Sequence, residues 1–145
     1  MIPVQVKDLM NPSVVTIEPT SSAALAARLL SRHNVGALPV CGADGRLRGM
    51  VTDRDIILRC IAAEEDPAQT PVRDIMTRGC AWVEPRSDCR QATQLMAQRQ
   101  VRRLPVVEGG KVVGIVSLAD LARSQRFDME AAQALGEISE NIVRR

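Results

Sequence analysis

The sequence predicts a mixed α/β (α+β) fold built from two copies of one βαββα unit, and three observations support this prediction. First, two stretches of the chain carry the same ordered residues 65–66 positions apart, and a repeat of that length defines the architecture. Second, short strand patterns alternate with amphipathic helix patterns inside each copy. Third, roughly 60 residues alone would bury only about 60% of their unfolded surface, whereas two copies together bury about 68–70%. We therefore expect the copies to pack as one pseudo-two-fold pair.

The repeat consists of short phrases that occur in the same order in each copy. The first copy contains Asp8-Leu9-Met10, Ile17-Glu18-Pro19, Leu38-Pro39-Val40 and Gly49-Met50-Val51-Thr52 followed by Asp55. The second copy contains Asp74-Ile75-Met76, Val83-Glu84-Pro85, Leu104-Pro105-Val106 and Gly114-Ile115-Val116-Ser117 followed by Asp120. We expect the repeats to occupy residues 4–66 and 70–126, with a proline-containing linker at 64–71 and a C-terminal amphipathic helix at 127–145.

Local signals give each element of the first copy. A β-branched run before Pro19 predicts a strand, hydroxyl residues predict helix caps, and Gly42-Ala43-Asp44-Gly45 is typical of a hairpin turn. The elements expected are a strand at 14–17, a helix from Ser21 or Ser22 to about His33, strands at 37–41 and 47–51, and a helix from Thr52 or Asp53 to about Ala63. The apolar residues of the last helix are Ile56, Ile57, Leu58 and Ile61.

The second copy repeats this order of elements. Ser87 can cap a helix to about Arg99, and strands at 103–107 and 111–116 flank the turn Glu108-Gly109-Gly110. Ser117 then begins the last helix of the repeat. The residues of the earlier helix that we expect to face inward are Ala92, Leu95 and Met96.

The C-terminal segment departs from the repeat and carries apolar residues at spacings of three and four, which predicts an amphipathic helix. These residues are Phe127, Ala131, Ala134 or Leu135, Ile138 and Ile142. The helix can pack on its own domain or on a partner subunit, and the sequence leaves both arrangements open. Two heptads are too short to form a stable isolated coiled coil.

Composition argues against several classes of partner. The chain has 145 residues, 46% of them hydrophobic, and 19 basic against 17 acidic residues give a net charge of only +2. A net charge this small gives no large positive field to attract nucleic acid. Trp82 and Phe127 are the only aromatic residues, so base stacking on single-stranded nucleic acid is also disfavoured. No apolar run approaches 18 residues and no secretory signal pattern is present, so we expect a soluble cytoplasmic protein and no membrane partner.

The cysteines and the single histidine indicate neither metal binding nor catalysis. Cys41, Cys60, Cys80 and Cys89 form no Cys-x-x-Cys motif, and His33 is not at a metal-ligand spacing from any of them. Buried, reduced thiols are the favoured interpretation over a redox or metal role. No nucleophile–base set, P-loop or paired metal-ligand motif is present, so we predict that the protein is not an enzyme.

The repeated closing phrase contains the chemistry of a nucleotide site. Thr52 and Asp55, like Ser117 and Asp120, lie at positions i and i+3 around a strand-to-helix junction. A helix N-terminus and a hydroxyl suit a phosphate, and a carboxylate one turn further can accept hydrogen bonds from two ribose hydroxyls. The alternative is structural, because Ser/Thr three residues before an acidic residue is also the pattern of a helix capping box. The recurrence of the pattern favours ligand binding by at least one copy.

The two copies differ in the residues that precede Leu-Pro-Val. The first copy has Gly36-Ala37, and the second has Arg102 and Arg103. Guanidinium groups at the start of that strand can form charge-assisted bonds to a phosphate, although a solvated basic edge would have the same sequence. The first copy instead carries Arg54 between Thr52 and Asp55. We expect the second-copy site to bind phosphate more tightly.

These phrases, taken in order and twice over about residues 4–124, resemble the cystathionine-β-synthase (CBS) domain family. The whole chain is similar to small stand-alone bacterial proteins made of one tandem CBS pair, including the hypoxic-response type. The resemblance implies a Bateman module, in which two CBS motifs form clefts for AMP, ADP, ATP or S-adenosyl compounds. It further implies that Asp55 and Asp120 hold ribose, that Thr52 and Ser117 contact phosphate, and that Arg102 and Arg103 reach it. The adenine would lie among apolar residues near Val14, Val15, Cys80, Ala81, Met50 and Ile115.

The function expected from this resemblance is that of a cytoplasmic, homodimeric sensor that binds an adenine nucleotide and signals to an unidentified protein partner. Ligand would shift the population toward one relative orientation of the two copies, and no cofactor is required. The alternative is a ligand-free homodimeric interaction or scaffold module of a stress response, in which Asp55 and Asp120 serve only as caps. The two hypotheses differ in whether an adenine nucleotide binds at all.

Overall fold

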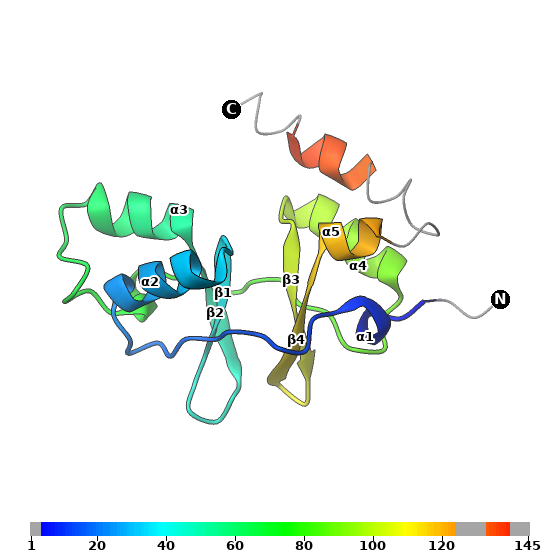
Figure 1. Ribbon diagram of the computed structural model, residues 1–145, viewed down its shortest axis with the longest axis horizontal. Helices are drawn as coiled ribbons and strands as arrows, with labels where there is room; N and C mark the ends of the chain where they lie inside the picture. The colour runs from blue at the N-terminus through cyan, green and yellow to red at the C-terminus, as the bar shows by residue number, and fades with distance from the viewer. Residues whose placement is uncertain (1–3, 124–132, 140–145) are drawn as a thin grey trace. The chain divides into compact units, whose positions relative to one another are not determined.

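The computed structural model describes residues 4–123 and 133–139 and has the mixed helix and strand fold that the repeat predicts (Figure 1). Its strands form two antiparallel hairpins, β1 with β2 and β3 with β4. In chain order the elements are α1 Val6–Leu9, α2 Ala23–His33, β1 Ala37–Cys41, β2 Leu47–Thr52, α3 Asp53–Ile56, the π-helical turn η1 Ile57–Ile61, the 3-10 turn η2 Val72–Asp74, α4 Cys89–Arg99, β3 Arg103–Glu108, β4 Lys111–Ser117 and α5 Leu118–Ala122.

The chain divides into two compact units that do not coincide with the sequence repeats. The first-copy unit, as we name it, comprises residues 15–80 and 110–112; the second-copy unit comprises the described residues of 1–14, 81–109 and 113–145. Each unit therefore takes its opening segment from the other repeat. Met10 belongs to the unit that contains β3, and Met76 belongs to the unit that contains β1. The ranges 4–66 and 70–126 remain a description of the repeats in sequence.

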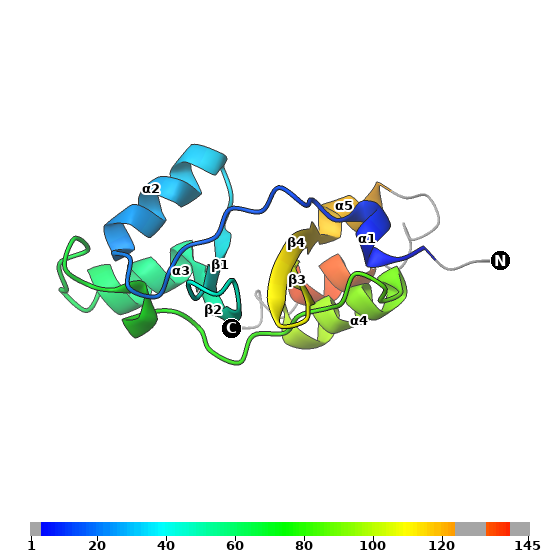
Figure 2. The ribbon, with the colours of Figure 1, turned by 90° about the horizontal axis from the view of Figure 1, so that it is seen from below.

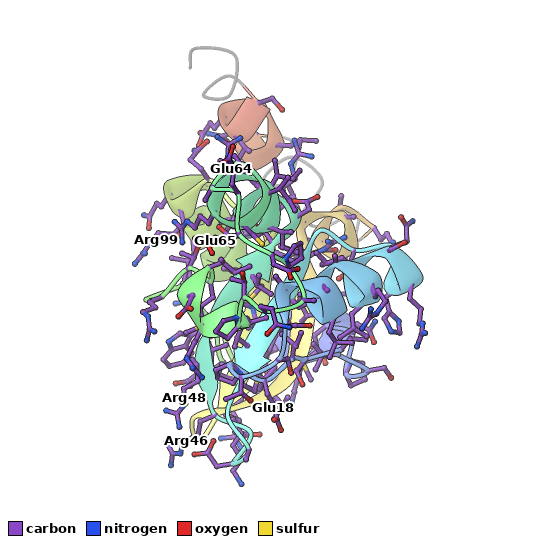
Figure 3. All side chains as sticks on the ribbon, turned by 90° about the vertical axis from the view of Figure 1, so that its left-hand side faces the viewer. Glu18, Arg46, Arg48, Glu64, Glu65 and Arg99 are labelled. Atoms are coloured by element: carbon purple, nitrogen blue, oxygen red, sulfur yellow. The ribbon has the colours of Figure 1, made fainter. Side chains whose placement is uncertain are left out.

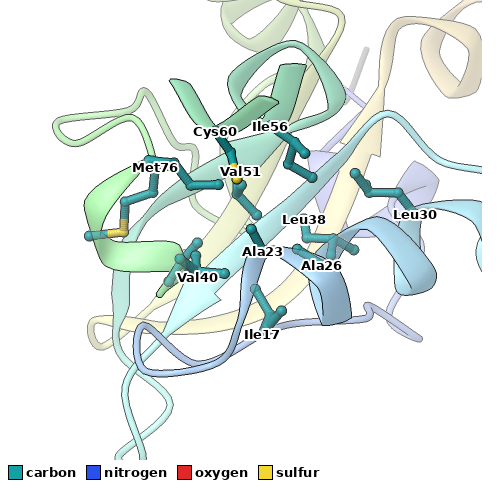
Figure 4. Packing of buried hydrophobic residues seen from close by; sticks show 12 residues of the cluster. Ile17, Ala23, Ala26, Leu30, Leu38, Val40, Val51, Ile56, Cys60 and Met76 are labelled. Atoms are coloured by element: carbon teal, nitrogen blue, oxygen red, sulfur yellow. The ribbon is translucent and has the colours of Figure 1, made fainter. Parts of the chain in front are cut away.

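The first-copy unit packs two helical segments against the β1–β2 hairpin. Helix α2 begins where Ser22 Oγ accepts a hydrogen bond from the Leu25 N–H (3.1 Å), and it contacts β1 and α3, which in turn contacts β2 (Figure 2). Leu38 pairs with Val51 across the hairpin. The core is aliphatic (Figure 4) and consists of Ile17, Ala23, Ala26, Leu30, Leu38, Val40, Val51, Ile56, Cys60, Val72, Ile75 and Met76.

The second-copy unit has the same plan, with one difference at a helix start. The N-cap of α4 is Asp88, whose side chain accepts a hydrogen bond from the Arg90 N–H, and not Ser87 as the pattern predicts. Ser87 Oγ instead accepts a hydrogen bond from the Glu84 N–H (3.1 Å) in the preceding turn. The buried core residues are Val6, Val83, Cys89, Ala92, Met96, Leu104, Val106, Val116, Leu118, Leu121 and Ala134.

The expected first strand of each repeat is reduced to a single bridge. Ile17 donates to Pro39 O (3.1 Å) and accepts from the Cys41 N–H (2.9 Å), and Val83 pairs in parallel with Val106 in the second-copy unit. In both copies proline follows two residues later, as Pro19 and Pro85. Because proline has no N–H to donate, it stops the pairing on its own side of the bridge. Residues 14–16, on the other side, form no ladder, so the predicted strand at 14–17 is wrong in length.

The helix after β2 contains a π-helical turn that the apolar pattern did not predict. Ile56 and Cys60 face the core, whereas Ile57, Leu58 and Ile61 are about half exposed. The helical segment ends at Glu64, which has a φ of 60°. The Glu64 N–H donates to Ile61 O and the Glu65 N–H to Cys60 O, as in a Schellman motif. Of the four apolar residues named for this helix, only Ile56 is therefore buried.

The described part of the C-terminal segment is helical over residues 133–139 and packs on its own chain. Ala134 and Ile138 are buried, and Ala134 joins the core of the second-copy unit, while Leu135 is exposed. This resolves the choice between Ala134 and Leu135 in favour of Ala134. The other residues of the predicted stripe, Phe127, Ala131 and Ile142, lie outside the described residues.

Candidate functional site

The Thr52/Asp55 junction is a complete capping box in the first-copy unit. Thr52 Oγ1 accepts a hydrogen bond from the Asp55 N–H (3.0 Å), and Asp55 Oδ2 accepts one from the Thr52 N–H (3.0 Å). Thr77 Oγ1 lies 3.4 Å from both carboxylate oxygens of Asp55, and Arg59 Nε lies 4.0 Å from Oδ1. Asp55 is only 8% exposed, so the protein itself surrounds this carboxylate.

The Ser117/Asp120 junction has the same capping box in a more open environment. Ser117 Oγ accepts from the Asp120 N–H (3.0 Å), and Asp120 Oδ2 accepts from the Ser117 N–H (2.9 Å). The second oxygen, Oδ1, lies 3.4 Å from Nη1 of Arg123, whose side chain is 78% exposed. The side chain of Asp120 is 19% exposed, against 11% for Asp55.

The capping geometry and ligand binding are chemically compatible. In each box the hydroxyl oxygen acts as an acceptor, which leaves its hydrogen free to donate to an anion. The carboxylate uses one oxygen for the cap, and an ionised carboxylate has further acceptor sites on the other. The two interpretations of Thr52/Asp55 and Ser117/Asp120 therefore do not exclude each other, and the surroundings of the second carboxylate oxygen distinguish the two junctions.

Backbone contacts bring Arg102 to the second junction and Gly36 to the first. The Leu118 N–H donates to Arg102 O (2.8 Å), and the equivalent Asp53 N–H donates to Gly36 O (3.1 Å). These bonds satisfy one N–H at each helix start, so fewer backbone donors remain for a phosphate than the sequence suggests. Arg102 is exposed, Arg103 is half-buried, and Arg54 is exposed at the start of α3.

The apolar residues expected around an adenine are divided between the two units. Met50, Val15 and Cys80 lie in the unit of Asp55, whereas Ile115, Val14 and Ala81 lie in the unit of Asp120. Backbone bridges fix these segments, because Met50 pairs with Thr77 and Ile115 pairs with Asn11. Sequence reasoning missed Thr77 and Asn11, although both follow directly on the Asp-aliphatic-Met phrase and that shared position was the available signal.

The glycine of each closing phrase allows a neighbouring backbone to approach. A Cβ placed on Gly49 would lie 2.5 Å from Thr77 O, and one placed on Gly114 would lie 2.7 Å from Met10 Sδ and 3.1 Å from Asn11 O. The close approach of a neighbouring backbone therefore accounts for glycine at both positions. The glycines thus hold the Thr77 and Asn11 segments beside β2 and β4.

Burial raises the pKa of three cysteine thiols, those of Cys41, Cys80 and Cys89. Burial, with a smaller contribution from Asp44 and Cys80, raises the pKa of Cys41 to about 11, and burial, with Asp88 and Asp8, does the same for Cys89. Burial also raises the pKa of Cys80. Thiols with raised pKa values stay protonated at neutral pH and are weak nucleophiles and ligands.

In residues 4–123 and 133–139, no group of three or more His, Cys, Asp or Glu side chains could hold a metal ion. The same residues contain no helix long and apolar enough to cross a membrane.

Comparison with known proteins identifies the same family twice along the chain. The model of the CBS domain matches residues 6–61 and 72–126. The CBS domain-containing protein YhcV of Bacillus subtilis is 46% identical over 138 residues, which is 95% of this chain and 97% of YhcV. Hypoxic response protein 1 of Mycobacterium tuberculosis is 37% identical over 117 residues, covering 81% of this chain and 82% of the relative.

Solved structures of CBS proteins share the fold. A crystal structure of Hypoxic Response Protein I with two coordinated zinc ions superposes with a TM-score of 0.78 at 36% identity, over 83% of this chain and 98% of that one. The CBS domain pair of protein MJ0100, solved in complex with 5'-methylthioadenosine and S-adenosyl-L-methionine, gives a TM-score of 0.74 at 28% identity. That alignment covers 84% of this chain and 95% of the other.

Proposed function

This chain belongs to the CBS domain family, and on that premise we propose that it is a regulatory protein that binds an adenosine ligand and signals its presence to a partner protein. Proteins composed only of CBS domains are generally regulatory, and the two CBS matches cover residues 6–61 and 72–126 of this chain. We propose no catalytic role. We further propose that the protein is a homodimer, acts in the cytoplasm and has no nucleic-acid or membrane partner.

The observation that carries the proposal is the state of Asp120. Its Oδ2 completes the capping box, and its Oδ1 is paired only with the exposed guanidinium of Arg123 among the described residues. An ion pair with an exposed arginine gives little stabilisation, because exposed ion pairs contribute about 0–1 kcal/mol. Asp120 Oδ1 can therefore exchange its ion pair with Arg123 for hydrogen bonds from the two vicinal hydroxyls of a ribose, with little loss of stability.

The residues around Asp120 suit the remaining parts of such a ligand. The Ser117 hydroxyl can donate to a phosphate or carboxylate, and Arg102 and Arg103 supply positive charge at the start of β3 beside the same junction. The ligands that we propose are AMP, ADP, ATP or an S-adenosyl compound. The complex of MJ0100 with 5'-methylthioadenosine and S-adenosyl-L-methionine supports the adenosine class. We propose no metal cofactor.

Signalling would follow from a shift between conformations that bind the ligand with different affinity. A ligand that contacts one conformation better shifts the population toward it by no more than that difference in binding free energy. The surface presented to a partner protein then changes with ligand occupancy. This mechanism requires binding but no chemical step.

A thermal-shift titration tests the proposal. AMP, ADP, ATP and S-adenosylmethionine would be added separately up to millimolar concentration, with GMP and GTP as matched controls. A ligand present at 100 times its Kd stabilises the native state by about 2.7 kcal/mol, which is several degrees in the melting temperature of a domain this size. If none of the adenosine compounds raises the melting temperature, or if the guanosine compounds act equally, the proposed function is wrong.

The alternative function is an interaction module that binds no small ligand. The completeness of both capping boxes favours it, because Asp55 and Asp120 already have a structural purpose. Under this alternative the adenosine compounds leave the melting temperature unchanged. Replacing either carboxylate should then lower the free energy of unfolding by about 1 kcal/mol, the contribution of a helix cap, and have no effect on ligand binding.

A further inference from the structure

Each capping junction has beside it one residue from the opening phrase of the other repeat, held there by the backbone. The Thr77 N–H donates to Met50 O (2.8 Å), and the Met50 N–H donates to Thr77 O (3.0 Å). Asn11 and Ile115 form the same two bonds, at 2.8 and 3.0 Å. Met50 and Ile115 each precede the capping hydroxyl residue by two positions. Thr77 and Asn11 therefore occupy equivalent places in the two units.

Although the backbones match, only the Thr77 side chain reaches a carboxylate. Thr77 Oγ1 lies 3.4 Å from both Oδ1 and Oδ2 of Asp55. The side-chain oxygen of Asn11 accepts a hydrogen bond from the Ser13 N–H (2.9 Å), and within the described part of the chain no hydrogen bond joins Asn11 to Asp120. Thr77 is exposed, so its contact with Asp55 lies at the surface of the first-copy unit, where a ligand would also have to approach.

Arg59 supports the Thr77 segment from the helical side of the unit. Its Nη1 donates to Ile75 O and Met76 O (3.2 and 3.1 Å), the two carbonyls that precede Thr77 in the chain. Its Nε lies 4.0 Å from Asp55 Oδ1. The same guanidinium therefore approaches the carboxylate and holds the backbone that brings the hydroxyl to it.

Two other exposed arginines of the first-copy unit have a different acidic partner. Arg46 and Arg48 lie at the turn end of the β1–β2 hairpin (Figure 3), and they pair with Asp44 at 3.8 and 3.4 Å. The junction lies at the opposite end of β2, at Thr52. Beyond its cap, Asp55 thus has one guanidinium and one hydroxyl as partners among the described residues. Removing the hydroxyl is the smaller change, because the guanidinium also holds the backbone.

We propose that the residue at this position, Thr77 in one unit and Asn11 in the other, determines which junction accepts the ribose of an adenosine ligand. The Thr77 hydroxyl donates to Asp55 in place of a ribose hydroxyl and excludes the ligand from the first junction. Asn11 makes no such bond, so Asp120 remains available. The inference rests on the proposed function, since it assumes that a carboxylate binds the ribose, and a measurement without ligand tests its structural half.

Installing a hydroxyl at the second junction should close it. Asn11→Thr should weaken the wild-type binding of AMP and of adenosine at least about tenfold, the equivalent of one hydrogen bond to a charged group. Asn11→Ala is the matched control, because it loses the same bond to Ser13 and adds no hydroxyl, and its dissociation constants should stay within about threefold of wild type. Isothermal titration calorimetry of the full chain measures these constants.

Removing the hydroxyl from the first junction should open it. Thr77→Ala should raise the stoichiometry of adenosine from near one to near two per chain. Thr77→Ser retains a hydroxyl and should stay near one. Adenosine is the informative probe here, because the first copy has Gly36-Ala37 where the second has the two arginines that suit a phosphate.

A double-mutant cycle without ligand tests the contact itself. Thr77→Ala should lower the melting temperature of the wild type by about 2–4 °C more than it lowers that of Asp55→Ala, because the second background lacks the carboxylate. Equal shifts would show that the hydroxyl does not bond to Asp55 and would overturn the inference. If the wild type binds but Asn11→Thr and Thr77→Ala behave as their controls, the inference alone is wrong. If neither AMP nor adenosine binds any of these proteins, the proposed function fails and the inference fails with it.

Discussion

The two strand-to-helix junctions of this protein have the same capping box and differ in what surrounds the free carboxylate oxygen. Both Asp55 and Asp120 give Oδ2 to the cap at about the same distance, 3.0 and 2.9 Å. At the first junction Thr77 Oγ1 and the Arg59 guanidinium approach the carboxylate, and the residue is buried. At the second, only the exposed Arg123 does so among the described residues. A repeated motif can therefore keep its structural role in both copies while the surroundings of its second carboxylate oxygen differ.

The contrast arises from a segment outside the motif. Thr77 comes from the opening phrase of the second repeat and is brought to Asp55 by its backbone pairing with Met50. Asn11 has the equivalent position beside Ile115. Its side-chain oxygen accepts a hydrogen bond from the Ser13 N–H (2.9 Å), two residues further along the chain. The Thr77 hydroxyl contacts Asp55 as a ribose hydroxyl would, so the first junction already has a substitute for the ligand group that we propose at the second.

The largest effect expected from this difference is on ligand affinity. Asp120→Ala should weaken binding of the best adenosine ligand by about 10–150-fold, which corresponds to the 1.5–3 kcal/mol of hydrogen bonds to a charged group. Asp55→Ala should change affinity far less, because its carboxylate is already surrounded. Isothermal titration calorimetry measures both constants and the stoichiometry, which should be near one ligand per chain.

Stability provides the control for the two aspartate variants. Both substitutions remove a cap and should lower the free energy of unfolding by about 1 kcal/mol, with Asp55→Ala the more costly because it also loses the contact with Thr77. Asp120→Ala should therefore lose more ligand affinity, whereas Asp55→Ala should lose more stability. Equal losses of affinity in the two variants would show that the junctions are equivalent as binding sites.

Replacing the glycine that precedes each junction should cost more stability at the first junction, where the aspartate is more buried, than at the second. Gly49→Ala is expected to cost about 2–3 kcal/mol of stability, because its Cβ would meet the rigid backbone oxygen of Thr77 at 2.5 Å. Gly114→Ala should cost about 1 kcal/mol, because the nearest atom is Met10 Sδ, at the end of a flexible side chain. Urea denaturation measures both values, and a larger loss for Gly114→Ala would contradict the packing described for the first-copy unit.

Much of the local structure follows from the sequence because its causes are local. The hairpin strands differ from their predicted bounds by one residue at most, since Gly45 and the Gly109-Gly110 pair mark the turns with φ values of 81°, 59° and 83°. The caps at Ser22, Thr52 and Ser117 are confirmed. The cap of α4 was assigned to the wrong residue, because Ser87 and Asp88 are adjacent and equally able to cap.

The features that sequence reasoning missed depend on contacts between distant segments. Nothing local in Thr77 indicates that it approaches Asp55, 22 residues earlier, and nothing in Met10 indicates that it packs against Gly114. The exchange of opening segments between the repeats is likewise a tertiary pairing. The candidate carboxylates could therefore be named from the repeat, whereas their unequal surroundings required the structure.

The smallest difference expected between the units concerns the residues that end their long helices. Helix α2 ends at Asn34 (φ 52°, ψ 49°) and α4 at Gln100 (φ 57°, ψ 43°), both in the left-handed conformation. Asparagine adopts this conformation more readily than glutamine. In addition, Oε1 of Gln100 is buried with no hydrogen-bond partner among the described residues, while its Nε2 donates to Ala97 O (2.6 Å).

Replacing each of these residues with glycine should therefore stabilise the second-copy unit more than the first. Gln100→Gly removes backbone strain and an unsatisfied oxygen and should raise the free energy of unfolding by about 0.5–1 kcal/mol. Asn34→Gly should change it by less than about 0.5 kcal/mol, because glycine's greater freedom in the unfolded chain offsets a smaller strain. Chemical denaturation of both variants beside the wild type resolves differences of this size when the m-values agree. A greater gain for Asn34→Gly would mean that the left-handed cap of α4 is not the more strained of the two.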